Sequence, residues 1–79
     1  MKISSAISKK LLNICKEKNI SINKLASMSC LTQSTVQNLI EGNSKNPKLL
    51  TIVRICDGLD IKIKDFFNDD IFDGIDRED

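Results

Sequence analysis

Apolar residues recur with helical spacing near the start of the chain. These residues are Ile3, Ile7, Leu11, Ile14 and Cys15. They fall three or four positions apart, which places their side chains on one face of a helix. The pattern predicts a helix from about residue 5 to residue 18, with Ser4 or Ser5 as its N-cap. Asn19 follows and is suited to end it, because asparagine tolerates the left-handed backbone of a C-terminal cap.

Two shorter helices are predicted next, separated by a turn of three residues. Ser21 is a good N-cap for a helix over 22–28, and Thr32 for a helix over 33–41. Gly42 is expected to end the second of these.

Two more helices complete the pattern. Pro47 suits the first turn of a helix over 48–57, which Gly58 is expected to end. A short helix should then run from residue 62 or 63 to residue 68. The alternation over 61–64 resembles a strand, but no other segment is available to pair with it. We therefore expect an all-α fold, a bundle of five helices.

The second and third helices have the features of a helix-turn-helix unit. Such helices cross steeply, so a small residue is needed where their backbones approach, and Ala26 holds that place. Val36, ten positions later, is the expected apolar lock between them. Leu25 and Leu39 complete the shared core.

The solvent side of the third helix is polar and uncharged. It carries Gln33, Ser34, Gln37 and Asn38, with Thr35 beside them. Gln and Asn can pair bidentately with the N6 and N7 edge of adenine in the major groove, and Ser and Thr can bond to bases or phosphates. We expect the first four to contact bases and Thr35 a phosphate. A solvated face without a partner is the alternative, but it explains neither this composition nor the turn.

The segment after the third helix is suited to binding phosphates. It offers Asn43, Lys45 and, at the start of the fourth helix, Lys48. Helix N-termini and lysines both attract phosphate, so these three residues and Thr32 are predicted phosphate contacts. Lys45 and Lys48 taken alone are equally consistent with a solubilising surface.

Charge is distributed unevenly along the chain. Residues 1–64 hold eleven Lys or Arg and four acids, a net charge of +7, whereas residues 65–79 hold one Arg and seven acids, a net charge of −6. A basic body suits a polyanionic partner. We divide the chain into a domain over 1–68 and an acidic tail over 69–79, which is either disordered or docked at a dimer interface.

Composition argues against several other classes of protein. The chain has no histidine, and its three cysteines are spaced for neither a disulfide framework nor a metal motif, so we expect them to be buried and reduced. No nucleophile–base pair is evident, so we expect no enzyme, no cofactor, no metal and no small-molecule ligand. No apolar run approaches the roughly 18 residues of a membrane span, and no signal peptide is recognisable, so the expected location is the cytoplasm.

These motifs together resemble the lambda-repressor/Cro-like helix-turn-helix family, also called the XRE family. The matching residues, over about 5–68, are Ser21, Leu25-Ala26, Leu31-Thr32-Gln33-Ser34-Thr35-Val36, Glu41-Gly42, Asn46-Pro47, Leu50, Ile55 and Ile63-Lys64-Asp65-Phe66-Phe67. The resemblance implies a five-helix lambda-repressor-like bundle whose third helix contacts double-stranded DNA. It also implies flanking backbone contacts from Ser21 and Asn23, and a homodimer. We expect the interface of that dimer near Phe66, Phe67, Ile71 and Phe72.

The chain departs from the family pattern at three places. Cys30 stands where the turn usually has glycine, and Asn19 where glycine usually follows the first helix. Cys15 and Ile40 replace an Arg–Glu pair that many members have. Such a joint replacement by apolar residues can be neutral or stabilising.

The function expected from the sequence is sequence-specific DNA binding by a transcriptional regulator, a repressor. The alternative is a protein-interaction module on the same fold, an antirepressor or an antitoxin component. A protein-binding version should display exposed apolar anchors on the third helix, where this chain has Gln, Ser and Asn.

Overall fold

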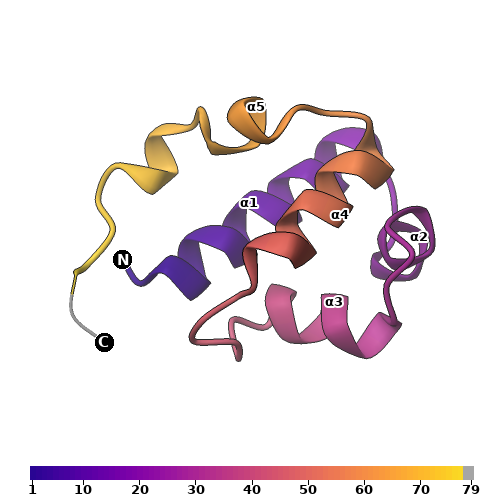
Figure 1. Ribbon diagram of the computed structural model, residues 1–79, viewed down its shortest axis with the longest axis horizontal. Coiled ribbons are helices and arrows are strands. Elements are labelled where there is room, and N and C mark those ends of the chain that lie inside the picture. Colours follow the sequence, from indigo (N-terminus) through magenta and orange to yellow (C-terminus); the bar gives the residue numbers. More distant parts are fainter. Residues whose placement is uncertain (78–79) are drawn as a thin grey trace.

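The computed structural model describes residues 1–77, which contain five α-helices, one short 3-10 helix and no strand (Figure 1). In chain order they are α1 (Ile3–Lys18), α2 (Ile22–Met28), α3 (Gln33–Ile40), α4 (Leu49–Leu59), α5 (Ile63–Phe67) and η1 (Asp70–Phe72). α3 contacts both α1 and α2, and α4 contacts α2 and α5. The all-α, five-helix prediction is confirmed. Glu78 and Asp79, the last residues of the predicted tail, lie outside the described residues.

The caps predicted for the helix-turn-helix unit are present. The Ser21 hydroxyl accepts a hydrogen bond from the Lys24 N–H at 3.1 Å, and the Thr32 hydroxyl accepts one from the Thr35 N–H at 3.2 Å. Each bond satisfies an N–H that the first helical turn leaves without a partner. Asn19 ends α1 in the left-handed region, with φ of 53°. These local signals fixed the boundaries of α2 and the start of α3.

The start of α1 differs from the prediction. The helix begins at Ile3, with Lys2 as an N-cap that makes no side-chain hydrogen bond. Ser4 therefore lies inside the helix, where it is buried, and Ser5 is exposed in the first turn. The serines were expected to cap the helix, but Ile3 packs against the core and extends the helix by two residues.

The end of α4 also differs, because Gly58 lies inside the helix. The helix continues to Leu59, and Asp60 ends it with φ of 56°. Gly58 has a packing role: a Cβ there would lie 2.9 Å from the Ser29 Cα and still closer to the Met28 carbonyl group. The glycine thus lets the backbone of α4 approach the C-terminal end of α2.

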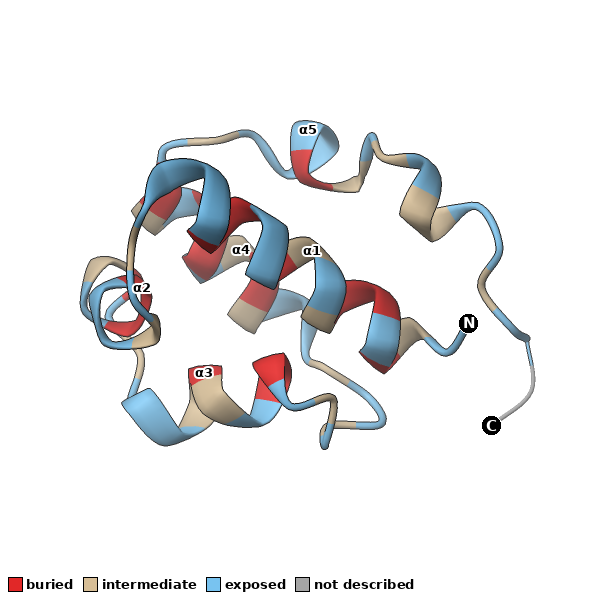
Figure 2. Cartoon of the chain, turned by 180° about the vertical axis from the view of Figure 1, so that it is seen from behind, coloured by how far each residue is buried: buried red, intermediate tan, exposed pale blue. Residues whose placement is uncertain are grey.

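One apolar core joins the first four helices and α5 (Figure 2). Ala26 and Val36, the predicted close-approach and lock residues, are both buried, as are Leu25 and Leu39. The other buried members are Ile7, Leu11, Ile14, Cys15, Ile40, Ile52, Ile55, Cys56, Leu59 and Phe66. The third cysteine, Cys30, is exposed, which corrects the expectation that all three are core residues.

Cys15 on α1 and Ile40 on α3, the apolar residues that stand in place of the Arg–Glu pair, both lie in the buried core. Burial raises the pKa of the Cys15 thiol. Beside them, the Ser8 hydroxyl donates to the Ile40 carbonyl oxygen. The two helices are therefore held together here without an ion pair.

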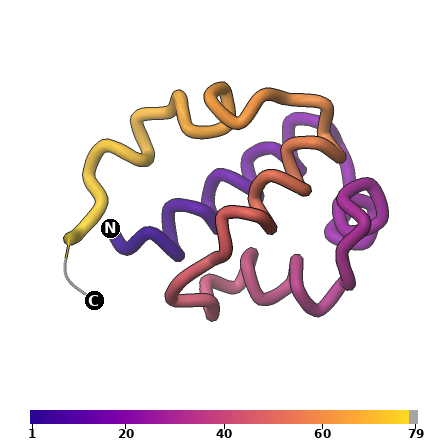
Figure 3. The backbone as a smooth tube through the Cα atoms, in the orientation of Figure 1, coloured from indigo at the N-terminus to yellow at the C-terminus, as the bar shows by residue number. Residues whose placement is uncertain are grey.

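The acidic segment through residue 77 folds back along α1, so that it ends close to the N-terminus of the chain (Figures 1 and 3). The Lys10 ammonium lies 2.9 Å from the Asp69 carboxylate, and both side chains are partly buried. Farther on, the Asp76 N–H donates to the Met1 carbonyl oxygen at 2.9 Å. The sequence offered disorder or a dimer interface for the tail; up to residue 77 it packs against its own chain.

Candidate nucleic-acid interface

The predicted base-contacting residues lie together on α3. Gln33, Ser34 and Asn38 are exposed, whereas Gln37 is half-buried. The opposite side of the same helix holds Val36, Leu39 and Ile40 in the core. Burial of that apolar side fixes the rotation of α3, so that its uncharged polar side faces outward. The outward side offers hydrogen-bond donors and acceptors with no intervening charge.

The start of α3 is tightly organised by two threonines. The Thr32 and Thr35 hydroxyl oxygens are 2.8 Å apart, in addition to the backbone cap described above. The Thr35 side chain also lines the groove beside α3. Both residues were predicted phosphate contacts, and the structure brings them together at the positive end of the helix dipole.

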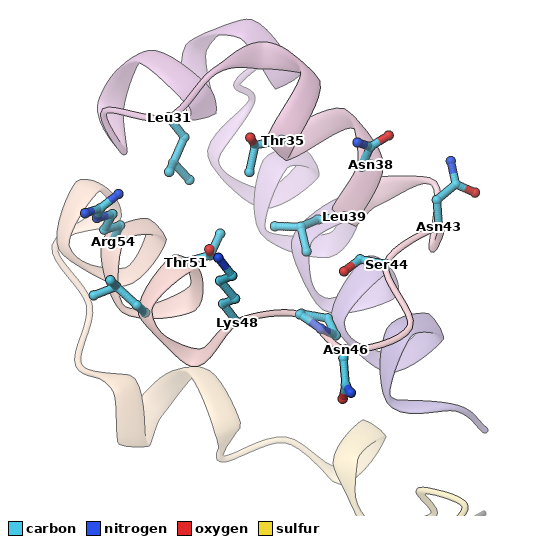
Figure 4. Close-up of a pocket in the computed structure, with 12 residues that line it drawn as sticks. Leu31, Thr35, Asn38, Leu39, Asn43, Ser44, Asn46, Lys48, Thr51 and Arg54 are labelled. Atoms are coloured by element: carbon cyan, nitrogen blue, oxygen red, sulfur yellow. The ribbon is translucent and has the colours of Figure 1, made fainter. Parts of the chain in front are cut away.

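A groove separates α3 from α4 (Figure 4). Its lining residues come from the turn before α3, from α3 itself, from the loop after it and from α4. They are Leu31, Thr35, Asn38, Leu39, Asn43, Ser44, Asn46, Pro47, Lys48, Leu50, Thr51 and Arg54. Leu31, Thr35 and Leu39 point from the side of α3 toward α4. Asn38 and Asn43 lie at the end of the groove away from Arg54.

The groove is basic and contains no acid among its lining residues. Its two charged side chains are Lys48 and Arg54, and the rest of its polar groups are hydroxyls and amides. Lys48, the N-cap of α4, makes no capping hydrogen bond with its side chain, so within residues 1–77 no side chain caps the N-terminal N–H groups of that helix. Positive charge, hydroxyls, amides and a helix N-terminus are the groups that bind a phosphate backbone.

Sequence reasoning missed Arg54 as a member of this site. The signal was present, because Arg54 follows Leu50 by four positions and Thr51 by three, on a helix that begins beside the predicted phosphate-binding loop. In the sequence, Arg54 counted only toward the positive charge of residues 1–64.

The other predicted phosphate contacts lie around the groove rather than in it. Lys45 is exposed on the loop between α3 and α4. Ser21 and Asn23 are exposed at the start of α2, outside the groove, and the Ser21 hydroxyl already accepts the capping hydrogen bond. Asn43 is exposed and lines the groove, with its amide bonded to a neighbouring carboxylate.

That carboxylate belongs to Glu41, which the sequence reasoning also left out of the site. The Gln37 amide nitrogen lies 2.8 Å from Glu41 Oε1, and the Asn43 amide nitrogen lies 2.9 Å from Glu41 Oε2. Gln37 and Glu41 are four positions apart on a helix, a spacing at which side chains meet. The spacing alone could have suggested the pair.

The three phenylalanines expected near a dimer interface form an aromatic cluster in the structure. The rings of Phe66 and Phe67 have centroids 5.0 Å apart, and Phe72 lies 5.0 Å from Phe67. Phe66 is 0% exposed, so it belongs to the chain's own core and offers no surface to a partner. Phe67, Ile71 and Phe72 are half-buried.

Comparison with known proteins identifies the class of this domain. Residues 10–70 match the family model for the Cro/C1-type HTH DNA-binding domain. A solved structure, described as the crystal structure of the prophage Lp1 protein 11, is 37% identical in sequence and superposes with a TM-score of 0.77. That match covers 87% of this chain and 92% of the other. No curated protein sequence gave a match.

The chain belongs to the Cro/C1-type helix-turn-helix DNA-binding domain family. Its architecture is the one that the sequence resemblance implied, with α2 and α3 as the helix-turn-helix unit. In residues 1–77, no helix has both the length and the apolar character needed to cross a bilayer.

Proposed function

We propose that this chain is a sequence-specific transcriptional repressor that binds operator DNA as a homodimer. In this proposal α3 enters the major groove, and Gln33, Ser34, Gln37 and Asn38 contact base edges. The observation that carries it is the combination of an uncharged, outward polar face on α3 with an acid-free basic groove directly beside it.

The groove supports separate roles for two sets of residues, one that contacts the phosphate backbone and one that contacts bases. Lys48, Arg54, Thr35 and Asn43 surround a space beside α3 that is lined by hydroxyl, amide and cationic groups. A phosphate backbone running there would set the register of α3, and Lys45, Ser21 and Asn23 would hold the flanking backbone. Such contacts position a protein on DNA, whereas the α3 side chains supply the sequence preference.

The small size of the site supports the proposed homodimer. One copy of α3 contacts only a half-site, and a two-fold dimer doubles the contacts on a palindromic operator. Three residues of the predicted interface stay half-buried after the acidic segment has folded back: Phe67, Ile71 and Phe72. Their remaining exposed surface is apolar, so a second copy of the chain could cover it. Sedimentation with and without operator DNA tests this, and a monomer at high micromolar concentration on its operator would contradict it.

The experiment that tests DNA recognition is a selection of bound duplexes from a random pool. It should be made at about physiological salt, because non-specific phosphate binding is suppressed there. We expect a palindrome whose half-sites lie about one helical turn apart. Failure to enrich any sequence would overturn the proposed function, and a reporter gene behind the selected operator then distinguishes repression from activation.

A protein-interaction module is the second candidate, and one observation favours it. Leu49 and Leu50, at the start of α4, are 63% and 59% exposed, and Leu50 lines the groove. Exposed leucines next to a groove are suited to an apolar partner. If no duplex is enriched, binding to a candidate partner protein should be measured for Leu50→Lys and for the control Lys64→Ala, which lies away from the groove. Weaker binding of Leu50→Lys alone would show that this surface binds a protein.

A further inference from the structure

Glu41 stands out in the proposed interface because of its charge. It is the sole acid between Glu17 and Asp57 in the sequence, and it lies at the C-terminal cap of α3. A carboxylate near a phosphate backbone is repelled by it, which weakens binding to every DNA sequence alike. A role in DNA recognition that offsets this repulsion must come from the contacts of Glu41.

The contacts of Glu41 indicate that role. Its two carboxylate oxygens accept hydrogen bonds from two different amides, Gln37 at 2.8 Å and Asn43 at 2.9 Å. One amide comes from α3 and the other from the loop after α3, so Glu41 ties the predicted base-contacting side chain to the segment that follows it. Neither bond belongs to the core of the fold, since Glu41 and Asn43 are exposed and Gln37 is half-buried.

Chemistry fixes the orientation of the Gln37 amide. An ionised carboxylate only accepts hydrogen bonds, so the group of Gln37 that faces Glu41 must be the NH2 and not the carbonyl oxygen. One N–H of Gln37 is then occupied. The other N–H and the carbonyl oxygen Oε1 remain available, so the held amide presents one donor and one acceptor.

The limit to one free donor and one free acceptor affects which purine base Gln37 can pair with. Adenine presents an acceptor at N7 and a donor at N6, which one N–H and one carbonyl oxygen match. Guanine presents acceptors at both N7 and O6. A free glutamine amide can donate both of its N–H groups to those acceptors, whereas an amide with one N–H bound to Glu41 cannot.

We propose that Glu41 is a positioning residue that makes Gln37 prefer adenine over guanine at one base pair of the operator. The inference rests on the proposed DNA-binding function and adds a specificity determinant to it. Glu41 acts through Gln37 and does not itself contact a base.

The test compares base preferences selected by four forms of the full chain: wild type, Gln37→Ala, Glu41→Gln and the Gln37→Ala/Glu41→Gln double variant. Loss of preference in Gln37→Ala identifies the base pair concerned. At that pair we expect wild type to prefer adenine over guanine by about fivefold or more, the range of a good bidentate contact. The glutamine in Glu41→Gln has nearly the shape of glutamate but can donate hydrogen bonds as well as accept them. The Gln37 amide can then turn its carbonyl oxygen toward residue 41, which frees both of its N–H groups for guanine. The ratio of adenine to guanine preference should therefore fall toward unity.

Two controls separate this effect from the loss of a negative charge. Glu41→Gln should also bind all sequences more tightly, but that change is uniform and leaves other base pairs unaltered. Glu17→Gln, at an exposed acid of α1, should leave the adenine preference intact. In the Gln37→Ala background, Glu41→Gln should not alter the preference at the identified pair.

The failures of the two proposals are distinguishable. If wild type selects an operator and Glu41→Gln keeps the full adenine preference at the identified pair, the positioning role is overturned while DNA recognition stands. The same holds if Gln37→Ala changes no base preference. If wild type enriches no sequence, the proposed function itself fails, and the positioning role fails with it.

Discussion

At the scale of single residues, the backbone at Cys30 carries a conformational cost. Its φ is +56°, in the left-handed region that glycine occupies readily, and a residue with a Cβ pays roughly 1 kcal/mol there. The side chain is exposed, so little packing is lost when it is removed. We expect Cys30→Gly to raise the free energy of unfolding by on the order of 1 kcal/mol, measured by urea denaturation.

The matched control for this change is Cys30→Ala. Alanine removes the thiol but keeps the Cβ that makes the conformation costly, so its stability should stay close to that of the wild type. Equal stability of the glycine and alanine variants would show that the turn relaxes without cost, and that the predicted strain is absent.

Gly58 is the opposite case, since its lack of a side chain is required by packing. Alanine normally favours a helix interior by about 1 kcal/mol over glycine. Here the added Cβ would meet the backbone of Met28 and Ser29, and backbone cannot rotate away as a side chain can. We expect Gly58→Ala to lower the free energy of unfolding by about 1–3 kcal/mol, the usual range for overpacking.

Gly74 provides the comparison for Gly58. A Cβ at Gly74 would meet nothing within 4 Å. Gly74→Ala should therefore leave the urea midpoint nearly unchanged. If Gly58→Ala were as stable as Gly74→Ala, the close approach of α4 and α2 would have to be looser than the structure shows.

At the scale of secondary-structure elements, α3 and α4 should make separable contributions to DNA binding. Gln33→Ala, on the outward face of α3, should weaken binding to the preferred operator by about 1–3 kcal/mol and relax selectivity at one base pair. The physical reason is that a base contact is lost while phosphate contacts remain. Titration of selected and mutated operators measures both effects.

Arg54→Ala and Lys45→Ala should behave differently from Gln33→Ala. Each removes a cation proposed to lie near phosphate, so binding should weaken for all sequences alike, and the slope of log K against log salt should fall by about 1. Lys64→Ala is the control, because α5 lies on the side of the molecule away from α3 (Figure 1). A change in base preference with either cation removed would reassign that residue to the base-contacting set.

The elements could be predicted well from the sequence where the signal was local. The Ser21 and Thr32 caps and the left-handed Asn19 each depend on a few neighbouring residues, and the structure has all three. The role of Gly58 could not be predicted in this way. A glycine near the end of an apolar stripe normally indicates a stop, and only the contact with α2, thirty residues away, shows why this one lies inside a helix.

The candidate site shows the same contrast between features set by local sequence and features set by contacts between distant segments. The outward polar face of α3 follows from helical periodicity alone, because the apolar positions fix which side is buried. Arg54 and Glu41 required knowledge of neighbours: Arg54 joins the site through the packing of α4 beside α3, and Glu41 through the path of the loop that brings Asn43 back to it.

At the scale of the whole molecule, the path of the acidic segment explains how opposite charges coexist in one small domain. The segment folds back along α1, and α5 and η1 lie on the side of the molecule away from α3 (Figure 1). The Phe66–Phe67–Phe72 cluster joins α5 to η1, and Lys10 neutralises Asp69. Acids that would repel phosphate next to α3 are thereby kept at a distance from the proposed DNA-binding face.

This arrangement makes the attachment of the acidic segment sensitive to acid. The backbone N–H of Ile71 and the ammonium of Lys10 lower the pKa of Asp69. A carboxyl group whose pKa is lower in the folded than in the unfolded state stabilises the fold above the unfolded value of about 3.9. That stabilisation is lost as pH falls through the lower, folded value, so docking should weaken below about pH 4.

The variant Asp69→Asn isolates the charge in this effect, because asparagine still offers a side-chain oxygen to the Ile71 N–H. Near pH 7 we expect Asp69→Asn to be less stable to urea than wild type, and the difference should shrink as pH falls below the unfolded pKa of about 3.9 and through the lower, folded pKa. Asp70→Asn is the control, since Asp70 is exposed and forms no ion pair within residues 1–77, and its difference from wild type should not change with pH in this way. A stability difference for Asp69→Asn that stays constant from pH 7 to pH 2.5 would mean that the Asp69 charge does not hold the segment against α1.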